Sequence, residues 1–184
     1  MIKPPKLYLK RTDIPMQSLL DMDFQDSVEE KAGVYRSKGG GTSSVDNDVR
    51  STTIKKDIEP KCYPDVCKYL VDMVNIWDPT LDPNDFEVLE FNYLKYGKGD
   101  KFKRHKDQIK QEGQPLRIYS TSTIVKTSDD LTGGDFIIWD HSDLPHTVEL
   151  KPGETIFFDS TVHHEVTEVT KGNREVLVAW IYYK

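Results

Sequence analysis

The second half of the chain alternates between short apolar segments and turn residues. After Asp85 the sequence contains seven strand candidates. They are Phe86–Tyr96, Arg117–Lys126, Asp135–Trp139, Thr147–Leu150, Thr155–Phe158, His164–Val169 and Glu175–Tyr183. Turn residues separate them, among them Gly133-Gly134, Lys151-Pro152-Gly153 and Lys171-Gly172-Asn173. Many short strands at such spacing predict a sandwich or barrel of antiparallel sheets.

The clearest helix of the first half runs from Pro60 to Trp77, where Asp78-Pro79 ends it. Its apolar residues recur three and four positions apart, so they form one stripe. They are Val66, Tyr69, Leu70, Met73, Val74 and Trp77. We interpret this stripe as a face that packs on a sheet.

Three further segments complete the first half. Asp13-Ile14-Pro15 predicts a short helix through about Met22, with aspartate as its cap and proline in its first turn. Ser37–Asp48 is rich in glycine, serine and acidic residues and is interpreted as a flexible loop. Arg50–Ile54 then predicts a strand. A chain of 184 residues is expected to form a single domain.

Composition narrows the class of function. The chain has 25 basic and 31 acidic side chains, a net charge of −6, which argues against a nucleic-acid partner. No apolar run reaches the length of a membrane span, and Met1–Pro5 does not begin a signal peptide, so we expect a soluble, cytoplasmic protein with no membrane partner. Cys62 and Cys67 are expected to be reduced residues on a helix.

One run departs from the acidic balance, between Lys98 and Lys110. It is interpreted either as a solvated loop or as a contact surface for an acidic substrate.

Four polar side chains predict a metal site with an anion clamp. His105 and Asp107 lie two positions apart, and on extended backbone such residues point to the same face. His164 would have to be brought to them by the fold. Two imidazoles and one carboxylate leave open positions on a metal, as non-haem Fe(II) oxygenases require. Arg174 supplies a guanidinium fork suited to a carboxylate.

The spacing of these residues resembles the Fe(II)/2-oxoglutarate-dependent oxygenase superfamily, and within it the prolyl 4-hydroxylase-like branch. Residues 96–107 match the pattern Y-x-x-G-x-x-F-x-x-H-x-D, and residues 164–174 match H-x-V-x-x-V-x-x-G-x-R. Trp180, Gly133-Gly134 and Pro152-Gly153 match further landmarks. The resemblance covers about Phe86–Tyr183.

The resemblance implies a mostly β fold with supporting helices. Its core would be a double-stranded β-helix, a cupin-like jelly roll, packed against N-terminal helices. Residues 1–85 would be the support and residues 86–184 the catalytic core of one Fe(II)/2-oxoglutarate dioxygenase domain.

The resemblance also implies roles for residues. His105, Asp107 and His164 would hold Fe(II), with 2-oxoglutarate and O2 as co-substrates. Arg174 would pair with the distal C5 carboxylate of 2-oxoglutarate. Tyr96 either gives a hydroxyl to the co-substrate or is a core aromatic. A substrate would be hydroxylated with release of succinate and CO2. The resemblance leaves the need for ascorbate and the oligomeric state open.

Several residues near these motifs are less certain ligands. His163 competes with His164, but only His164 has the family's offsets to Val166 and Arg174. Because adjacent strand residues face opposite ways, His163 is expected at the surface or in contact with one of the metal-binding side chains. His141 and His146 are expected to be exposed turn residues. Ile124 and Val176 stand where relatives have a tyrosine or a serine, so the second partner of the C5 carboxylate is not identified.

Three functions follow as alternatives. The first is a hydroxylase of a protein or peptide, at proline. The second is a hydroxylase of a free amino acid or another small molecule. The third is a non-catalytic, cupin-like binding module that retains a metal. DNA-repair demethylation is disfavoured, because that branch has a second arginine where this chain has Trp180.

Overall fold

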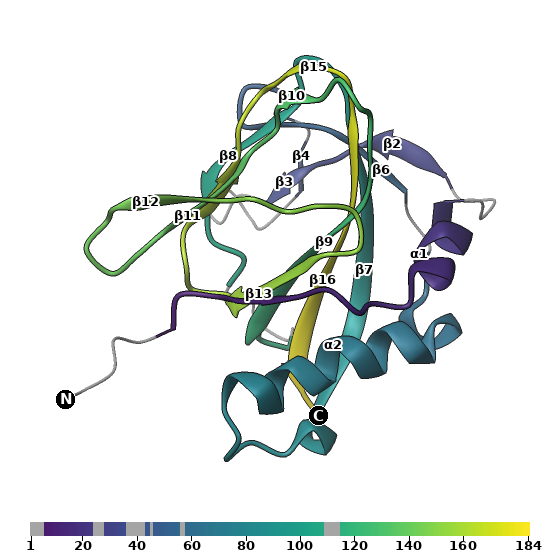
Figure 1. Cartoon of the computed structure of the whole chain (residues 1–184), viewed down its shortest axis with the longest axis vertical. Coiled ribbons are helices and arrows are strands. Elements are labelled where there is room, and N and C mark those ends of the chain that lie inside the picture. The colour runs from purple at the N-terminus through teal and green to yellow at the C-terminus, as the bar shows by residue number, and fades with distance from the viewer. Residues whose placement is uncertain (1–5, 24–27, 36–42, 45, 56–57, 109–114) are drawn as a thin grey trace.

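Two antiparallel sheets form the body of the protein in a computed structural model (Figure 1). The structure describes residues 6–184 except 24–27, 36–42, 45, 56–57 and 109–114. The larger sheet has the order β1 (Leu9–Arg11), β13 (Thr155–Asp159), β9 (Tyr119–Thr127), β16 (Arg174–Tyr183), β7 (Phe86–Tyr96), β6 (Thr53–Lys55) and β2 (Glu29–Lys31). The smaller sheet has the order β12 (Pro145–Val148), β11 (Phe136–Trp139), β14 (His164–Val166), β8 (Lys101–His105) and β5 (Arg50–Ser51).

Two further pairs of short strands form small sheets of their own. They are β10 (Thr132–Gly133) with β15 (Val169–Lys171), and β3 (Val34–Tyr35) with β4 (Ser43–Ser44). The helices are α1 (Met16–Asp23) and α2 (Pro64–Trp77), with single turns of 3-10 helix at Pro60–Cys62 and Pro83–Asp85. Within the described residues, neither α1 nor α2 has the length and apolar character that crossing a membrane requires.

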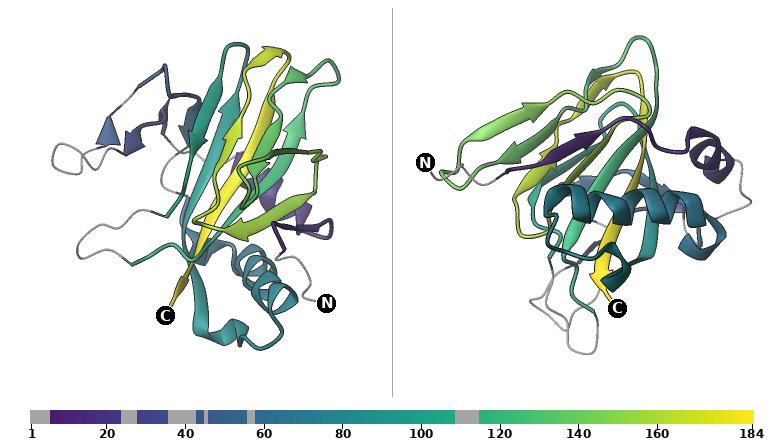
Figure 2. Two further views of the ribbon diagram at one scale, coloured as in Figure 1. Left: turned by 90° about the vertical axis from the view of Figure 1, so that its left-hand side faces the viewer. Right: turned by 60° about the horizontal axis from the view of Figure 1, so that its bottom comes forward.

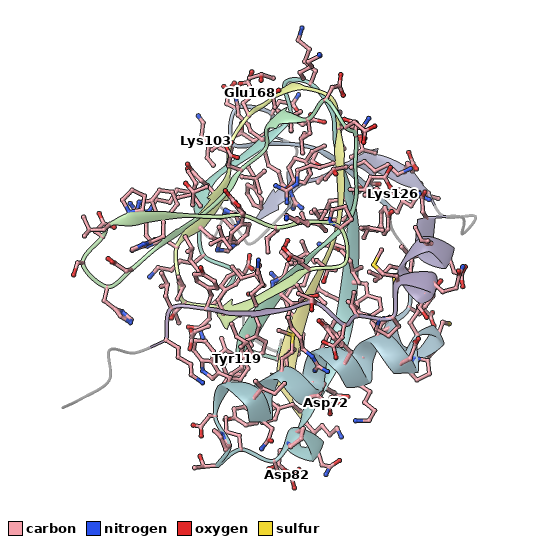
Figure 3. All side chains as sticks on the ribbon, viewed as in Figure 1. Asp72, Asp82, Lys103, Tyr119, Lys126 and Glu168 are labelled. Atoms are coloured by element: carbon pink, nitrogen blue, oxygen red, sulfur yellow. The ribbon has the colours of Figure 1, made fainter. Side chains whose placement is uncertain are left out.

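A first apolar cluster lies between the larger sheet and the helices. The buried residues of α2 are Val66, Tyr69, Leu70, Met73 and Val74. They pack against side chains of β7, β13 and β16, and the view in Figure 2 shows α2 lying across that sheet. Tyr119 of β9 stacks on Phe157 in this cluster, with ring centroids 4.8 Å apart (Figure 3). The prediction that the helix presents a sheet-packing stripe is therefore confirmed.

A second apolar cluster lies between the two sheets. It joins Leu94 and Tyr96 of β7 to Phe136 and Ile138 of β11, with Val166 of β14. Because one face of each sheet is buried in this cluster, the two sheets enclose a common interior, as the strand pattern predicted.

A bulge in β7 decides which of its side chains enter this interior. Glu90 pairs with Trp180 and Val88 pairs with Ile181, so Leu89 is an extra residue on β7. An extra residue reverses the alternation of the strand. Before the bulge, Val88 faces the helices; beyond it, the even-numbered residues from Glu90 to Tyr96 face the interior.

Several expected elements differ from those observed. The helix expected from Pro60 begins at Pro64, because a proline tolerates the first helical position while Pro60 forms a separate turn. The strand expected at His164–Val169 divides into β14 and β15, which belong to different sheets. Arg50–Ile54 likewise divides, with Thr52 between β5 and β6. The strand expected at Thr147–Leu150 is β12, two residues earlier.

Two expectations concern segments that are only partly described. Most of the loop expected at Ser37–Asp48 lies outside the described residues, but Ser43–Ser44 pairs with β3 and is strand rather than loop. Cys62 and Cys67 are free, as expected, although only Cys67 lies on α2.

Candidate metal and anion site

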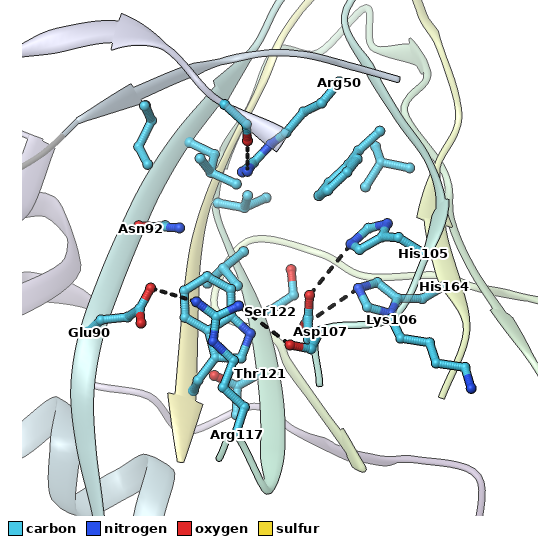
Figure 4. Close-up of a pocket in the computed structure, with 18 of the residues that line it drawn as sticks. Arg50, Glu90, Asn92, His105, Lys106, Asp107, Arg117, Thr121, Ser122 and His164 are labelled. Carbon is cyan, nitrogen blue, oxygen red and sulfur yellow. Dashed lines mark hydrogen bonds and ion pairs between the residues drawn. The ribbon is translucent and has the colours of Figure 1, made fainter. Parts of the chain in front are cut away.

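The strand pairing of the smaller sheet brings two histidines face to face. His105 ends β8, His164 begins β14, and the two residues are direct cross-strand partners. Asp107 lies in the bend that follows β8. Its carboxylate oxygens lie 3.5 Å from His105 Nε2 and 3.6 Å from His164 Nε2 (Figure 4). One donor atom from each side chain falls within 4.8 Å of the others, so the three form a cluster able to hold one metal ion.

Backbone contacts fix the orientation of both imidazoles. His105 Nδ1 lies 2.7 Å from the carbonyl oxygen of Lys103, and His164 Nδ1 lies 3.1 Å from that of Val162. A carbonyl oxygen only accepts, so each Nδ1 carries the proton and donates it. Each Nε2 therefore presents its lone pair toward Asp107, which is the arrangement that metal-binding histidines adopt.

Burial sets the charge state of the cluster. It lowers the pKa of His164 to about 4, so this imidazole is neutral at neutral pH and free to coordinate. Burial alone would raise the pKa of the Asp107 carboxyl, but the neighbouring imidazoles of His164 and His105 hold that pKa well below its usual range. A neutral imidazole beside an ionised carboxylate is the donor set that a divalent cation requires.

Arg174 is a buried cation with unused hydrogen-bonding capacity. It begins β16, is 2% exposed, and donates through Nη1 to the carbonyl oxygen of Gly134. Among the described residues its Nε and Nη2 have no hydrogen-bond partner. A buried guanidinium with two idle donors indicates a site that an acceptor from outside the protein completes.

Gly134 makes room for this guanidinium. Its φ is +69°, and a Cβ there would lie 3.1 Å from Cδ of Arg174 and 2.9 Å from Cγ2 of Val169. Tyr96 flanks Arg174, whose guanidinium carbon lies 5.6 Å from the ring centroid. Burial raises the pKa of the Tyr96 phenol, and the charges of Arg50 and Arg174 act against that rise.

The metal cluster and Arg174 open into one cavity of about 780 Å³ between the sheets. Tyr96 and Arg174 line it, as do His105, Asp107 and His164. The cavity is therefore large enough for a small diacid together with part of a second molecule.

The other residues considered from the sequence lie outside the metal cluster. His163 turns from the cluster toward Arg104, whose Nη2 lies 3.3 Å from His163 Nδ1. His141 is an exposed turn residue, as expected. His146 is also exposed but lies on strand β12 rather than in a turn, and its Nε2 lies 2.8 Å from a carboxylate oxygen of Asp140. Val176 lines the cavity, and Ile124 is buried in the apolar cluster between the sheets, so neither offers a polar partner to an anion.

The basic run at Lys98–Lys110 contains a strand. Its Lys101 pairs with Glu168 at 3.2 Å, Lys106 lines the cavity, and Lys103 is exposed. Its last two residues lie outside the described part of the chain.

Two arginines that line the cavity were not predicted from the sequence. Arg117 donates to Glu90 at 2.8 Å and to the Tyr182 hydroxyl at 3.2 Å, and its guanidinium carbon lies 3.7 Å from the ring centroid of Trp180. Arg50 is 9% exposed and also lines the cavity. A signal for it existed: Arg50, Thr52 and Ile54 are two positions apart, so strand periodicity places the arginine on the same side as a core isoleucine.

The chain is similar to known proteins over the part that forms this site. The family model described as the 2OG-Fe(II) oxygenase superfamily matches residues 91–182. A PKHD-type hydroxylase of Caulobacter vibrioides is 34% identical over 100 residues, which cover 51% of this chain and 43% of that protein. The chain therefore spans less than half the length of this curated relative.

Solved structures show the same fold at low identity. A Pseudomonas putida prolyl-4-hydroxylase superposes with a TM-score of 0.62 at 18% identity, covering 96% of this chain and 92% of that one. The viral collagen prolyl hydroxylase of Paramecium Bursaria Chlorella virus-1, in a 2OG complex, gives a TM-score of 0.64 at 16% identity, with 97% of each chain covered.

Proposed function

Because this chain belongs to the 2OG-Fe(II) oxygenase superfamily, we propose that it is an Fe(II)- and 2-oxoglutarate-dependent dioxygenase that hydroxylates a peptide substrate at proline. The observation that carries the proposal is one cavity that holds both a His-Asp-His cluster and a buried arginine with idle donors. Succinate and CO2 are the other products. The single domain comprises residues 1–184, with residues 1–85 supporting a jelly-roll core of residues 86–184.

His105, Asp107 and His164 are the proposed ligands of Fe(II). Bound iron would supply the activation of O2, driven by oxidative decarboxylation of 2-oxoglutarate. The protein's part is to present two imidazoles whose Nδ1 atoms are fixed on backbone carbonyls, together with one ionised carboxylate. The hydrogen bonds from Nδ1 of each histidine to a backbone carbonyl hold the rings in that orientation before the metal arrives.

Arg174 is the proposed partner of the C5 carboxylate of 2-oxoglutarate. Its two idle donors match a carboxylate, and its burial removes competing water. Tyr96, beside it, is the proposed second contact through its hydroxyl. This assignment fits the absence of a polar group at Ile124 and Val176 noted above.

The proposal of a peptide substrate rests on similarity and on the far end of the cavity. The similar proteins are named a PKHD-type hydroxylase and prolyl hydroxylases. At that end, Trp180 offers an aromatic wall and Arg117 lies over it. An aromatic wall with a few polar groups suits an apolar ring such as proline held within a polar backbone.

The test is conversion of 2-oxoglutarate to succinate by the purified chain with Fe(II), followed by mass spectrometry of peptides and metabolites for one added oxygen. We expect succinate from the wild type even without a second substrate. Arg174→Gln should weaken 2-oxoglutarate binding by about 2–5 kcal/mol, because the carboxylate loses a buried charged partner. Lys151→Gln, at an exposed lysine that does not line the cavity, is the matched control. Succinate equal to that of an enzyme-free sample would favour the metal-retaining binding module.

The same panel separates the substrate classes. An added oxygen on proline-containing peptides supports the peptide hydroxylase. An added oxygen only on free amino acids or other metabolites would replace it with the small-molecule hydroxylase.

A further inference from the structure

Arg50 is a second buried guanidinium in the cavity, and the proposed chemistry does not use it. It donates through Nη1 to the carbonyl oxygen of Gly33 at 3.3 Å, and its Nε has no partner among the described residues. No carboxylate of the described residues forms an ion pair with it. Burial lowers the pKa of Arg50 from its ordinary value, so the fold holds this charge at a cost.

A stack of rings holds Arg50 beside the metal cluster. Arg50 of β5 pairs with Phe102 of β8, and its guanidinium carbon lies 4.5 Å from the Phe102 ring centroid. Phe102 stacks in turn on His105, with centroids 3.5 Å apart and planes at 19°. Figure 4 shows Arg50 reaching across the cavity on the side of His105. The charge is therefore held one ring away from a proposed iron ligand.

Arg50 faces a different part of the cavity from Arg174. Arg50 pairs with Phe102 of β8 in the smaller sheet, whereas Arg174 pairs with Tyr96 of β7 in the larger sheet. The ring stack places Arg50 on the His105 side of the cavity, where a second molecule would lie beside the metal. One diacid bound at Arg174 leaves the donors of Arg50 unused.

Arg117, another cation that lines the cavity, already has hydrogen-bond partners. Arg117 is paired with Glu90 and with the Tyr182 hydroxyl. Among the described residues, Arg50 donates to one backbone carbonyl, which does not offset its charge. A neutral acceptor would leave the charge uncompensated, whereas a carboxylate would complete it.

We propose that Arg50 binds a carboxylate of the hydroxylated substrate, so that the enzyme selects acidic substrates. The carboxylate is either an acidic side chain next to the modified residue or a free α-carboxylate of the chain end. This proposal rests on the function proposed above, because it places a second molecule in the same cavity.

Paramagnetic NMR with Co(II) in the metal site tests whether Arg50 binds a carboxylate. The sample contains saturating 2-oxoglutarate, so that Arg174 is already occupied. Two pairs of probes differ only in their acid: acetyl-Pro-Glu-amide against acetyl-Pro-Gln-amide, and acetyl-Gln-Pro with a free carboxylate against acetyl-Gln-Pro-amide. We expect Co(II) to broaden at least one acidic probe, with a dissociation constant about tenfold below that of its neutral partner. Which acidic probe binds tells whether the carboxylate is a side chain or a chain end.

Variants assign the effect to Arg50. Arg50→Gln should remove the tenfold preference, while Arg50→Lys should keep part of it, because the charge persists without the planar fork. Lys151→Gln, at an exposed lysine that does not line the cavity, should leave the preference unchanged. Affinity for 2-oxoglutarate should stay within about twofold of wild type in Arg50→Gln, in contrast to Arg174→Gln.

Four results would overturn the proposal. They are equal or absent broadening by acidic and neutral probes, a preference that persists in Arg50→Gln, a loss of 2-oxoglutarate binding in that variant, and a loss of Co(II) binding. The last two would make Arg50 part of the co-substrate site or a support of His105. Succinate formation by the wild type, measured on the same preparation, separates failure of this proposal from failure of the proposed function.

Discussion

Gly134 shows how one missing side chain shapes the anion site. The position has a left-handed backbone and two side chains within contact of any added Cβ. An alanine would strain the backbone and press on Cδ of Arg174. The orientation of the guanidinium group depends on the position of these aliphatic carbons of Arg174.

We therefore expect Gly134→Ala to lower the free energy of unfolding by about 2–5 kcal/mol and to weaken 2-oxoglutarate binding. Gly99→Ala is the control: its φ is +88°, but no atom lies within 4 Å of an added Cβ. It should cost only about 1–2 kcal/mol of backbone strain and leave binding intact. Denaturant titration and calorimetry measure both quantities. Equal loss of binding in the two variants would contradict the steric explanation.

Neighbouring histidines give a second test at this scale. His164→Ala should abolish metal binding, because it removes one of three donors, while His163→Ala should largely preserve it, since His163 contacts Arg104. The metal content of reconstituted protein measures this. The reverse pattern would mean that the distal ligand is assigned one residue too late.

Residue patterns in the sequence were sufficient to find these donors but not Arg50. The donors occur at offsets that a family pattern specifies, so a single reading of the chain finds them. The spacing of Arg50 from Ile54 puts it on the core side of a strand, but that signal is weak, because an arginine in a short strand is ordinarily solvated.

At the scale of elements, α1 is tied to the larger sheet by charge. Asp23 ends α1, and its carboxylate contacts Lys55, Lys95 and Lys126, which lie on β6, β7 and β9. The Lys55 side chain is only 5% exposed, and its ammonium lies 3.4 Å from the Asp23 carboxylate and 3.9 Å from that of Glu29. Burial by itself would raise the pKa of Asp23, but hydrogen bonds from Lys126 and Lys95 lower it to about 2.

Asp23→Asn should therefore destabilise the protein by about 2–3 kcal/mol at neutral pH. A carboxyl with a lowered folded-state pKa stabilises above its unfolded value, near 4, and loses that contribution as the pH falls toward 2. The gap between wild type and variant should close over this window in denaturant titrations. Asp21→Asn, exposed on the same helix, should change stability by less than about 0.5 kcal/mol. A gap that is independent of pH would disprove the role of ionisation.

Elements with a strong local pattern were predictable, and those that depend on distant pairing were not. Phe86–Tyr96 was expected with its observed bounds, because it combines a long apolar run with clear turn signals. Leu9–Arg11 was missed, since only its pairing with β13, far along the chain, makes it a strand. The division of His164–Val169 has the same cause, because its first half pairs with β11 and its last residue begins a strand that pairs with β10.

At the scale of the whole molecule, the metal cluster joins separate parts of the chain. Its ligands come from the end of β8, the bend after it and the start of β14. A ligand that binds only the folded state stabilises it by about 2.7 kcal/mol at a concentration one hundred times its dissociation constant. Metal binding should therefore raise the free energy of global unfolding.

We expect Mn(II) at that excess to raise the melting temperature by about 5–10 °C, since each kcal/mol corresponds to about 2–4 °C in a chain of this size. Asp107→Ala should lose the rise, and Lys151→Gln, at an exposed position, should keep it. Differential scanning calorimetry at several metal concentrations checks the logarithmic dependence. A similar rise in Asp107→Ala would show that the metal binds elsewhere.

The direct pairing of His105 with His164 has a consequence for how such a protein diversifies. The gap between the two imidazoles is set by the spacing of neighbouring strands, so intervening hairpins are free to grow, shrink or be exchanged without detuning the reactive centre. Selectivity can then be rewritten at the periphery while the chemistry stays constant. An engineer seeking a new target for this scaffold would begin by grafting loops.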